Sequence, residues 1–110
     1  MQHEGTTTVA LQLAASFARS GVKTLIIDGD LRQPSVHASL GLKPEAGLAE
    51  VLRGEVEPAA AVQRTAVNGL LALTGGRCDY EAITALSRPV AAAVVDELRA
   101  KFDQIVIDAG

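Results

Sequence analysis

Apolar residues in the first part of the chain recur at the spacing of one helical face. Between Thr7 and Arg19 this face is followed by Ser20-Gly21, a combination that ends helices, so a helix is predicted over residues 7–19. The next run, residues 22–28, is rich in β-branched residues and almost wholly apolar near its end. That pattern predicts a strand buried on both faces, as strands of parallel sheets are.

The rest of the chain alternates between short helices and two further strands. The strands are expected at residues 70–74 and 103–108. Helices are expected over the following ranges: a short one capped by Ser35 and running through Leu40, then 48–53, 58–63, 80–86 and 89–101. This alternation predicts an α/β fold, a three-layer sandwich with a mostly parallel sheet.

The order of elements predicts that the chain is part of a larger domain. A parallel α/β unit normally begins with a strand that leads into the first helix, but only five residues precede Thr6. We therefore expect residues 1–110 to form a partial domain, truncated at both ends and lacking its first strand.

Composition narrows the classes of function. Of the 110 residues 48% are hydrophobic, and the net charge of −3 is spread without a basic cluster, which argues against nucleic acid as a partner. No apolar stretch approaches the roughly 18 to 20 residues that span a bilayer, and no signal peptide is recognisable, so a cytoplasmic protein without direct membrane insertion is expected. The single cysteine, Cys78, and the two histidines have no metal-binding spacing.

The first candidate for chemistry is the stretch "HEGTTT", residues 3–8. It matches the end of a phosphate-binding loop, G-x-x-x-x-G-K-[ST], whose backbone N–H groups wrap phosphates and whose hydroxyl binds Mg²⁺. Gly5 falls on the second glycine, Thr6 on the lysine and Thr7 on the hydroxyl residue. Taken alone, the stretch is better explained as a threonine cap that begins a helix, because such a cap needs no ligand.

The second candidate is a set of aspartates at strand ends. Asp28 and Asp30 follow one predicted strand, and Asp108 ends another. The carboxyl edge of a parallel sheet is where α/β proteins bind ligands, and two acids at this edge favour a metal, so Asp28 and Asp108 are expected near the start of the Thr7 helix. The alternative is a set of solvated turns, in which aspartate is common.

Taken together, these stretches resemble the deviant P-loop ATPases of the MinD/ParA type, and among them most closely the bacterial tyrosine kinases (BY-kinases) of capsule and exopolysaccharide synthesis. The resemblance covers nearly the whole chain. It rests on "EGTTTVALQLA", on "LIIDGDLRQPSVH", which resembles the Walker A′ motif, on "GLAEVLRGEV" and "NGLLALTGG", and on "FDQIVIDAG", which resembles Walker B.

The resemblance implies an ATP and Mg²⁺ site and phosphoryl transfer to protein tyrosine. Residues 5–8, Gly5, Thr6, Thr7 and Thr8, would hold the nucleotide. Thr7, Asp28, Asp30 and Asp108 would hold the metal, and Asp28 and Asp30 would be catalytic. For Arg32, a contact with ligand and a contact with another subunit remain open. A membrane-bound chain-length regulator would be the partner, holding the protein at the inner face of the membrane, and a homo-oligomer is a further expectation.

Two residues depart from the family pattern. Thr6 replaces the Walker A lysine, and His3 stands where close relatives have glycine. An impaired enzyme is therefore one hypothesis, and a nucleotide-independent interaction module, a pseudo-kinase, is the alternative. The third option is a MinD/ParA-type partitioning ATPase, which fits "DLRQPSVH" less well than the kinase family does. A dinucleotide-binding oxidoreductase ranks last because G-x-G-x-x-G is absent.

Overall fold

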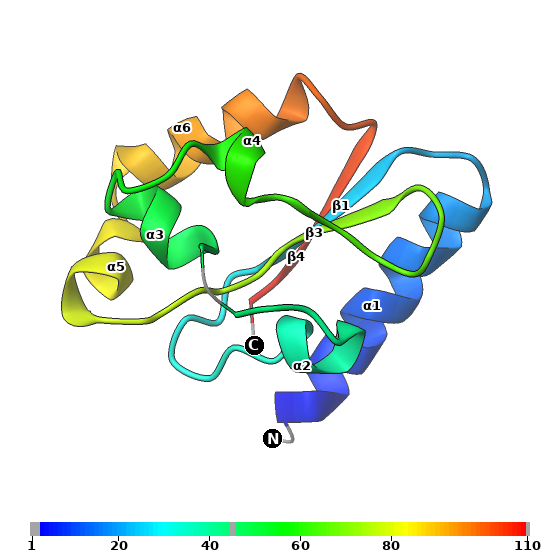
Figure 1. Cartoon of the computed structure of the whole chain (residues 1–110), viewed down its shortest axis with the longest axis horizontal. Coiled ribbons are helices and arrows are strands. Elements are labelled where there is room, and N and C mark those ends of the chain that lie inside the picture. The colour runs from blue at the N-terminus through cyan, green and yellow to red at the C-terminus, as the bar shows by residue number, and fades with distance from the viewer. Residues whose placement is uncertain (1–2, 45, 110) are drawn as a thin grey trace.

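The chain alternates helices and strands, as its sequence predicts (Figure 1). The computed structural model describes the backbone of residues 3–44 and 46–109 and the side chains of residues 5–44 and 46–109. The helices are α1 His3–Arg19, α2 Val36–Leu40, α3 Leu48–Leu52, α4 Pro58–Ala61, α5 Tyr80–Ala85 and α6 Pro89–Arg99. The strands are β1 Thr24–Asp28, β2 Gln63–Arg64, β3 Leu70–Leu73 and β4 Gln104–Asp108.

The described strands form one sheet in the order β2-β3-β1-β4. Strand β1 lies in its centre and pairs in parallel with β3 on one side and with β4 on the other. Helices α1 and α2 lie on one side of this sheet, and α3 to α6 lie on the other (Figure 1). The fold is therefore the predicted α/β sandwich of three layers with a mostly parallel sheet.

Alternation along β1 divides the core between the two faces of the sheet. Leu25 and Ile27 pack among the residues of α3 to α6, whereas Ile26 packs among Ala14 and Ala18 of α1. Successive side chains of a strand point to opposite faces, so a strand that is apolar at every position must be covered on both sides. Every residue of β1 is buried.

Most predicted boundaries differ from the structure by one or two residues, and two differences change the picture more. The helix predicted over residues 58–63 ends at Ala61, and Gln63 and Arg64 instead form β2, which pairs antiparallel with β3. The partner for this pairing is distant in the sequence, so local periodicity does not reveal it. Helix α1 begins at His3 rather than Thr7, because each residue added to an existing helix gains a backbone hydrogen bond at little cost.

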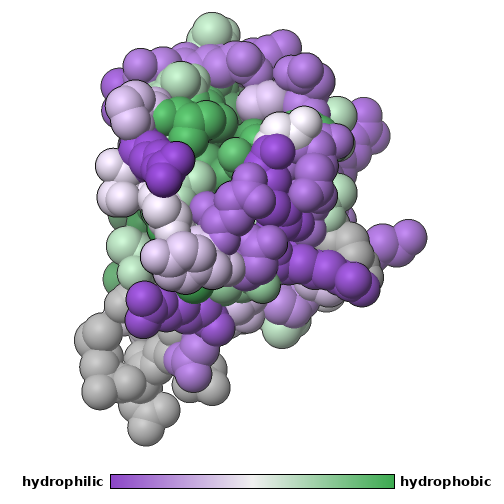
Figure 2. Space-filling model, turned by 90° about the vertical axis from the view of Figure 1, so that its left-hand side faces the viewer, coloured by the Kyte–Doolittle hydropathy of each residue, from purple (hydrophilic) through white to green (hydrophobic). Residues whose placement is uncertain are grey.

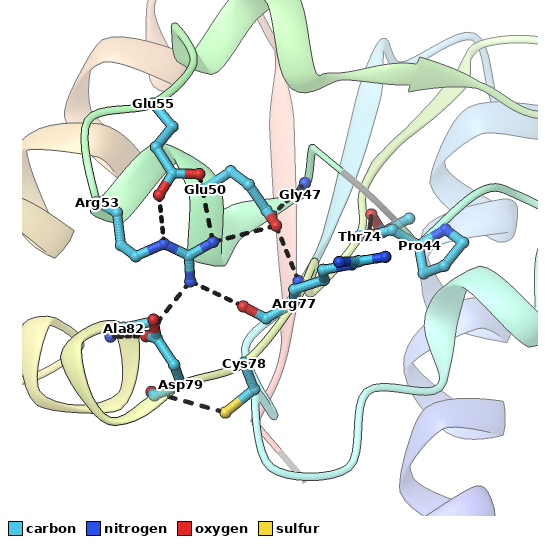
Figure 3. Close-up of polar contacts among 10 residues, drawn as sticks. All are labelled: Pro44, Gly47, Glu50, Arg53, Glu55, Thr74, Arg77, Cys78, Asp79 and Ala82. Atoms are coloured by element: carbon cyan, nitrogen blue, oxygen red, sulfur yellow. Dashed lines mark hydrogen bonds and ion pairs between the residues drawn. The ribbon is translucent and has the colours of Figure 1, made fainter.

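A buried ion-pair network joins α3 to the turn that follows β3 (Figure 3). Glu50 accepts hydrogen bonds from the backbone N–H groups of Gly47 and Arg77, and its carboxylate also binds Arg53. The guanidinium of Arg53 reaches the backbone oxygen of Arg77 and the carboxylate of Asp79 as well. The side chain of Arg77 points away from this network. The network therefore holds this turn through the backbone of Arg77 and the side chain of Asp79.

Replacing Glu50 with alanine should destabilise the fold. The change leaves two backbone N–H groups and the largely buried Arg53 without this acceptor, and we expect a loss of about 2 to 3 kcal/mol in the free energy of unfolding. Urea unfolding measures this loss. Glu57→Ala is the control, because Glu57 is exposed, and it should stay within about 0.5 kcal/mol of the wild type. Equal losses in the two variants would contradict a role for the network.

Candidate nucleotide and metal site

The carboxyl ends of β1 and β4 meet the beginning of α1. Asp28 and Asp108 are paired across the two strands in parallel register, and Gly29 N–H donates a 2.8 Å hydrogen bond to the backbone oxygen of Asp108. A Cβ atom at position 29 would lie only 3.2 Å from that oxygen, so glycine permits the close approach. In Figure 1 the beginning of α1, α2 and the end of β4 lie together on the lower side of the molecule.

Thr7 connects α1 to the end of β4. Its side chain is 1% exposed, and its hydroxyl donates a 2.7 Å hydrogen bond to Oδ2 of Asp108, which is 3% exposed. The same hydroxyl oxygen lies 2.5 Å from Oγ of Ser35, in the segment that leads into α2. Two residues that are 101 positions apart in the sequence thus share one buried hydrogen bond.

Asp28 holds the loop that follows β1. Its carboxylate is fully buried, and Oδ2 accepts hydrogen bonds from the N–H groups of Ser35 and Val36, at 2.9 and 3.1 Å. Oδ1 accepts a third from the N–H of Asp30 at 3.1 Å. The side chain of Asp28 therefore satisfies two backbone donors at the start of α2, a task that an N-cap side chain usually performs.

Burial is the main cause that raises the pKa of Asp28 above its ordinary value, and the nearby carboxylate of Asp108 raises it further. The backbone hydrogen bonds from Val36, Asp30 and Ser35 act in the opposite direction and lower the pKa, without cancelling the rise. A buried carboxylate beside a second carboxylate is a setting in which a bound cation would relieve the repulsion.

The raised pKa of Asp28 has a consequence for stability. A carboxyl group with a raised folded-state pKa stabilises the fold fully below its unfolded pKa, and this contribution is lost as the pH rises through the folded value. The wild type, compared with Asp28→Asn, should therefore lose free energy of unfolding as the pH rises. Urea unfolding of both proteins between about pH 3 and 7 measures the difference. A difference that is constant, or that grows with pH in favour of the wild type, would contradict this prediction.

The other predicted site residues lie around this centre. Gly5 and Thr8 are exposed and Thr6 is half-buried, all at the beginning of α1, while the side chain of His3 lies outside the described residues. Asp30 is half-buried in the loop after β1, where its Oδ1 accepts a 3.3 Å hydrogen bond from the N–H of Gln33. The described contacts bring Thr7, Asp28 and Asp108 together and leave Asp30 at their margin.

One residue at the centre was not assigned to the site from the sequence. Ser35 was expected only to cap a short helix, yet its own side chain makes no capping hydrogen bond and instead contacts Thr7. Its position within "DLRQPSVH", five residues after Asp30, is the feature of the sequence that could have identified it. Arg32, in the same stretch, is exposed.

The donor set suits a magnesium ion that is shared with phosphate oxygens. Among the described side chains, those of residues 5–44 and 46–109, no group of three or more His, Cys, Asp or Glu residues is arranged to hold a metal by itself. Magnesium usually takes one or two carboxylates and completes its shell with water and substrate phosphates. The hard oxygen atoms of Thr7, Asp28 and Asp108 meet that requirement, so these residues fit the implied metal.

A groove on another side of the molecule is lined by residues that differ from those of the candidate site. A groove of about 580 Å³ on the side of α3, α5 and α6 is lined by apolar residues such as Leu52 and Val90 and by the charged Glu81 and Arg88. Figure 2 shows this side of the molecule as largely hydrophilic, with an apolar area in its upper part. The lining includes none of the predicted site residues, so the candidate site remains the carboxyl edge of the sheet.

Comparison with known proteins finds that the chain is similar to part of several bacterial tyrosine kinases. No protein-family model matches the chain. The tyrosine-protein kinase YwqD of Bacillus subtilis is 35% identical over 105 residues, which cover 96% of this chain and 44% of YwqD. The succinoglycan biosynthesis transport protein ExoP of Rhizobium meliloti is 33% identical over 108 residues, covering 96% of this chain and 14% of ExoP. The chain thus spans less than half the length of either relative.

Solved structures give the same relationship. The chimerical protein CapA2B2 matches with a TM-score of 0.87 and 29% identity, covering 93% of this chain and 45% of that one. The cell division ATPase MinD of Pyrococcus furiosus matches with a TM-score of 0.82 and 32% identity. The match covers 94% of this chain and 44% of MinD. MinD of Pyrococcus horikoshii, solved in complex with Mg-ADP, matches with a TM-score of 0.80 and 30% identity. This match covers 94% of this chain and 43% of that protein. The fold is that of the P-loop NTPases.

Proposed function

We propose, since the homologues of this chain are bacterial tyrosine kinases of capsule and exopolysaccharide synthesis, that the chain is the magnesium-nucleotide-binding part of such a kinase. It corresponds to one part of a P-loop domain, because it spans 44% of YwqD. The reaction of the whole protein would be phosphoryl transfer from ATP to protein tyrosine.

The observation that carries this proposal is the contact of Thr7 with Asp108 beside Asp28. A hydroxyl at the start of a helix and two carboxylates at strand ends form a buried oxygen-rich centre at the carboxyl edge of the sheet. Thr7, Asp28 and Asp108 would hold Mg²⁺ directly or through water, and Asp30 would contribute from its margin. A bound magnesium ion would neutralise charge on the transferred phosphoryl group.

Residues at the beginning of α1 would hold the phosphates. Gly5 and Thr6 lie in the first turn of a 17-residue helix, where backbone N–H groups and the positive end of the helix dipole favour an anion, and Thr7 and Thr8 follow in the next turn. Asp28 and Asp30 would have the catalytic task of orienting the attacking hydroxyl group. Thr6 supplies no positive charge at the lysine position, so the proposed activity is weaker than that of a site with lysine.

The proposed partner of this chain lies in the cell membrane. ExoP is a biosynthesis transport protein, and CapA2B2 is named as a chimera. No helix in the described part of this chain is long and apolar enough to cross a bilayer. We propose that a membrane-bound chain-length regulator recruits the chain to the inner face of the membrane, and that it forms a homo-oligomer.

Two alternatives are each favoured by an observation. Thr6 in place of lysine favours a nucleotide-independent interaction module, in which the fold is kept for binding a partner. The likeness to MinD favours a partitioning-type ATPase. Both would require the centre around Thr7 and Asp108 to serve a purpose other than tyrosine phosphorylation.

Calorimetric titration of the chain with ATP, with and without Mg²⁺, tests the proposal. We expect heat of binding that depends on Mg²⁺ and that is lost in Asp108→Asn, because this variant removes a carboxylate from the centre. Gln12→Asn, an exposed change on α1, is the control and should bind as the wild type does. Binding that is absent from the wild type would reject the proposal and favour the interaction module.

A further inference from the structure

Ser35 contacts two residues of the candidate site, Thr7 and Asp28. Its side-chain oxygen lies 2.5 Å from the hydroxyl oxygen of Thr7, at the beginning of α1. Its backbone N–H donates a 2.9 Å hydrogen bond to Oδ2 of Asp28, at the end of β1. One residue therefore contacts both the beginning of α1 and the carboxyl end of β1.

The direction of the hydrogen bond between the two hydroxyl groups follows from their neighbours. Thr7 has one hydroxyl proton, and it donates that proton to Asp108. The proton between Thr7 and Ser35 must therefore come from Ser35, which makes a directed chain from Ser35 through Thr7 to the carboxylate of Asp108. A chain of this kind restricts the rotation of Thr7 about its Cα–Cβ bond.

Close packing holds the segment that carries Ser35. Pro34 restricts the backbone immediately before it, and a Cβ atom at position 75 would lie 2.7 Å from Cβ of Pro34. Glycine at position 75 thus lets the turn after β3 press directly against this segment. That turn is in turn fixed by Glu50, which binds the N–H of Arg77. The segment that carries Ser35 is therefore held in place by packing against the turn that follows β3.

We propose that Ser35 is a positioning residue of the magnesium-nucleotide site, an inference that rests on the proposed function. Its hydroxyl orients Thr7 toward Asp108, and its N–H holds the carboxylate of Asp28, so Ser35 contacts two of the three side chains proposed to hold the metal. Ser35 itself contacts neither metal nor nucleotide. Its contribution is to the geometry of the groups that do.

Three variants separate this role from a general effect on the fold. Ser35→Ala removes the hydroxyl but keeps the backbone N–H, and Ser35→Thr restores a hydroxyl at the same place. Ser39→Ala makes the same chemical change at an exposed position of α2 and serves as the control. We expect Ser35→Ala to weaken Mg-ADP binding by about 3- to 10-fold, the range expected for one hydrogen bond. Ser35→Thr and Ser39→Ala should bind as the wild type does.

A second measurement needs no ligand. Three-bond NMR couplings report the side-chain rotamer of Thr7, which should be single in the wild type, Ser35→Thr and Ser39→Ala, and averaged in Ser35→Ala. An unchanged rotamer of Thr7 in Ser35→Ala would overturn the positioning role. If the wild type does not bind Mg-ADP, the proposed function fails, while the rotamer comparison still decides whether Ser35 orients Thr7.

Discussion

Thr6→Lys is expected to strengthen nucleotide binding by about 10- to 100-fold. Thr6 is half-buried at the beginning of α1, directly before the hydroxyl residue Thr7. A lysine at this position would place an ammonium group beside the phosphates, and a charge-assisted hydrogen bond contributes on the order of 1.5 to 3 kcal/mol. Calorimetric titration of both proteins with Mg-ATP measures the gain.

The same substitution should weaken the ligand-free protein slightly. A positive charge in the first turn of a helix opposes the helix dipole and costs about 0.3 to 1 kcal/mol. Thr6→Lys should therefore unfold at a lower temperature than the wild type without nucleotide and at a higher temperature with saturating Mg-ATP. This crossing distinguishes a restored phosphate contact from a general stabilisation of α1.

Gln12→Lys is the matched control for Thr6→Lys. It adds the same charge at an exposed position on the same helix, away from its beginning, and should leave the affinity for Mg-ATP unchanged. Equal affinities of the wild type and Thr6→Lys would mean that residues 3–8 only begin a helix. The interaction-module alternative would then become the better explanation of the chain.

Asp28→Ala is expected to cost about 3 to 5 kcal/mol of the free energy of unfolding. The carboxylate is fully buried and accepts three backbone N–H groups, from Asp30, Ser35 and Val36. Each buried donor left without an acceptor costs about 1 to 3 kcal/mol, and relief of the repulsion from Asp108 offsets part of the total. Domains of this size have only about 5 to 15 kcal/mol of stability in all, so the loss is a large fraction.

Asp30→Ala is the matched comparison for Asp28→Ala. Asp30 is half-buried, and the hydrogen bond that its carboxylate accepts from Gln33 is long, at 3.3 Å. We expect a loss below about 1 kcal/mol from urea unfolding of this variant. Similar losses in the two variants would show that Asp28 does not hold the loop after β1 and serves only as a ligand-binding group.

Asp28 combines a proposed role in metal binding with a structural role at the start of α2. A strand-end aspartate indicates a metal site or a turn, and the sequence offers no way to choose between them. The buried hydrogen bonds to Ser35 and Val36 show that Asp28 organises the start of α2. A metal bound at this carboxylate would therefore be coupled to the geometry of the following loop.

The layers of the fold and its main strands follow from local patterns in the sequence. The run "TLIID" is apolar throughout because β1 lies in the centre of the sheet and is covered on both faces. The helix predicted from residue 89 begins at Pro89, which the helix start tolerates. Spacing reports which side of an element is buried, and this is a local property. The ends of the predicted strands made Asp28 and Asp108 candidates, and the resemblance of "LIIDGDLRQPSVH" and "FDQIVIDAG" to known motifs gave them an expected metal-binding role.

Contacts between distant segments were decided only by the tertiary structure. The pairing of β2 with β3, the hydrogen bond from Thr7 to Asp108 and the contact of Ser35 with Thr7 each join residues that no local period relates. The buried Glu50 is a further example, because an acidic residue on a short helix is normally read as solvent-exposed. Side-chain hydrogen bonds depend on the packing of whole elements, and a sequence pattern specifies the buried face of each element but not which atoms meet there.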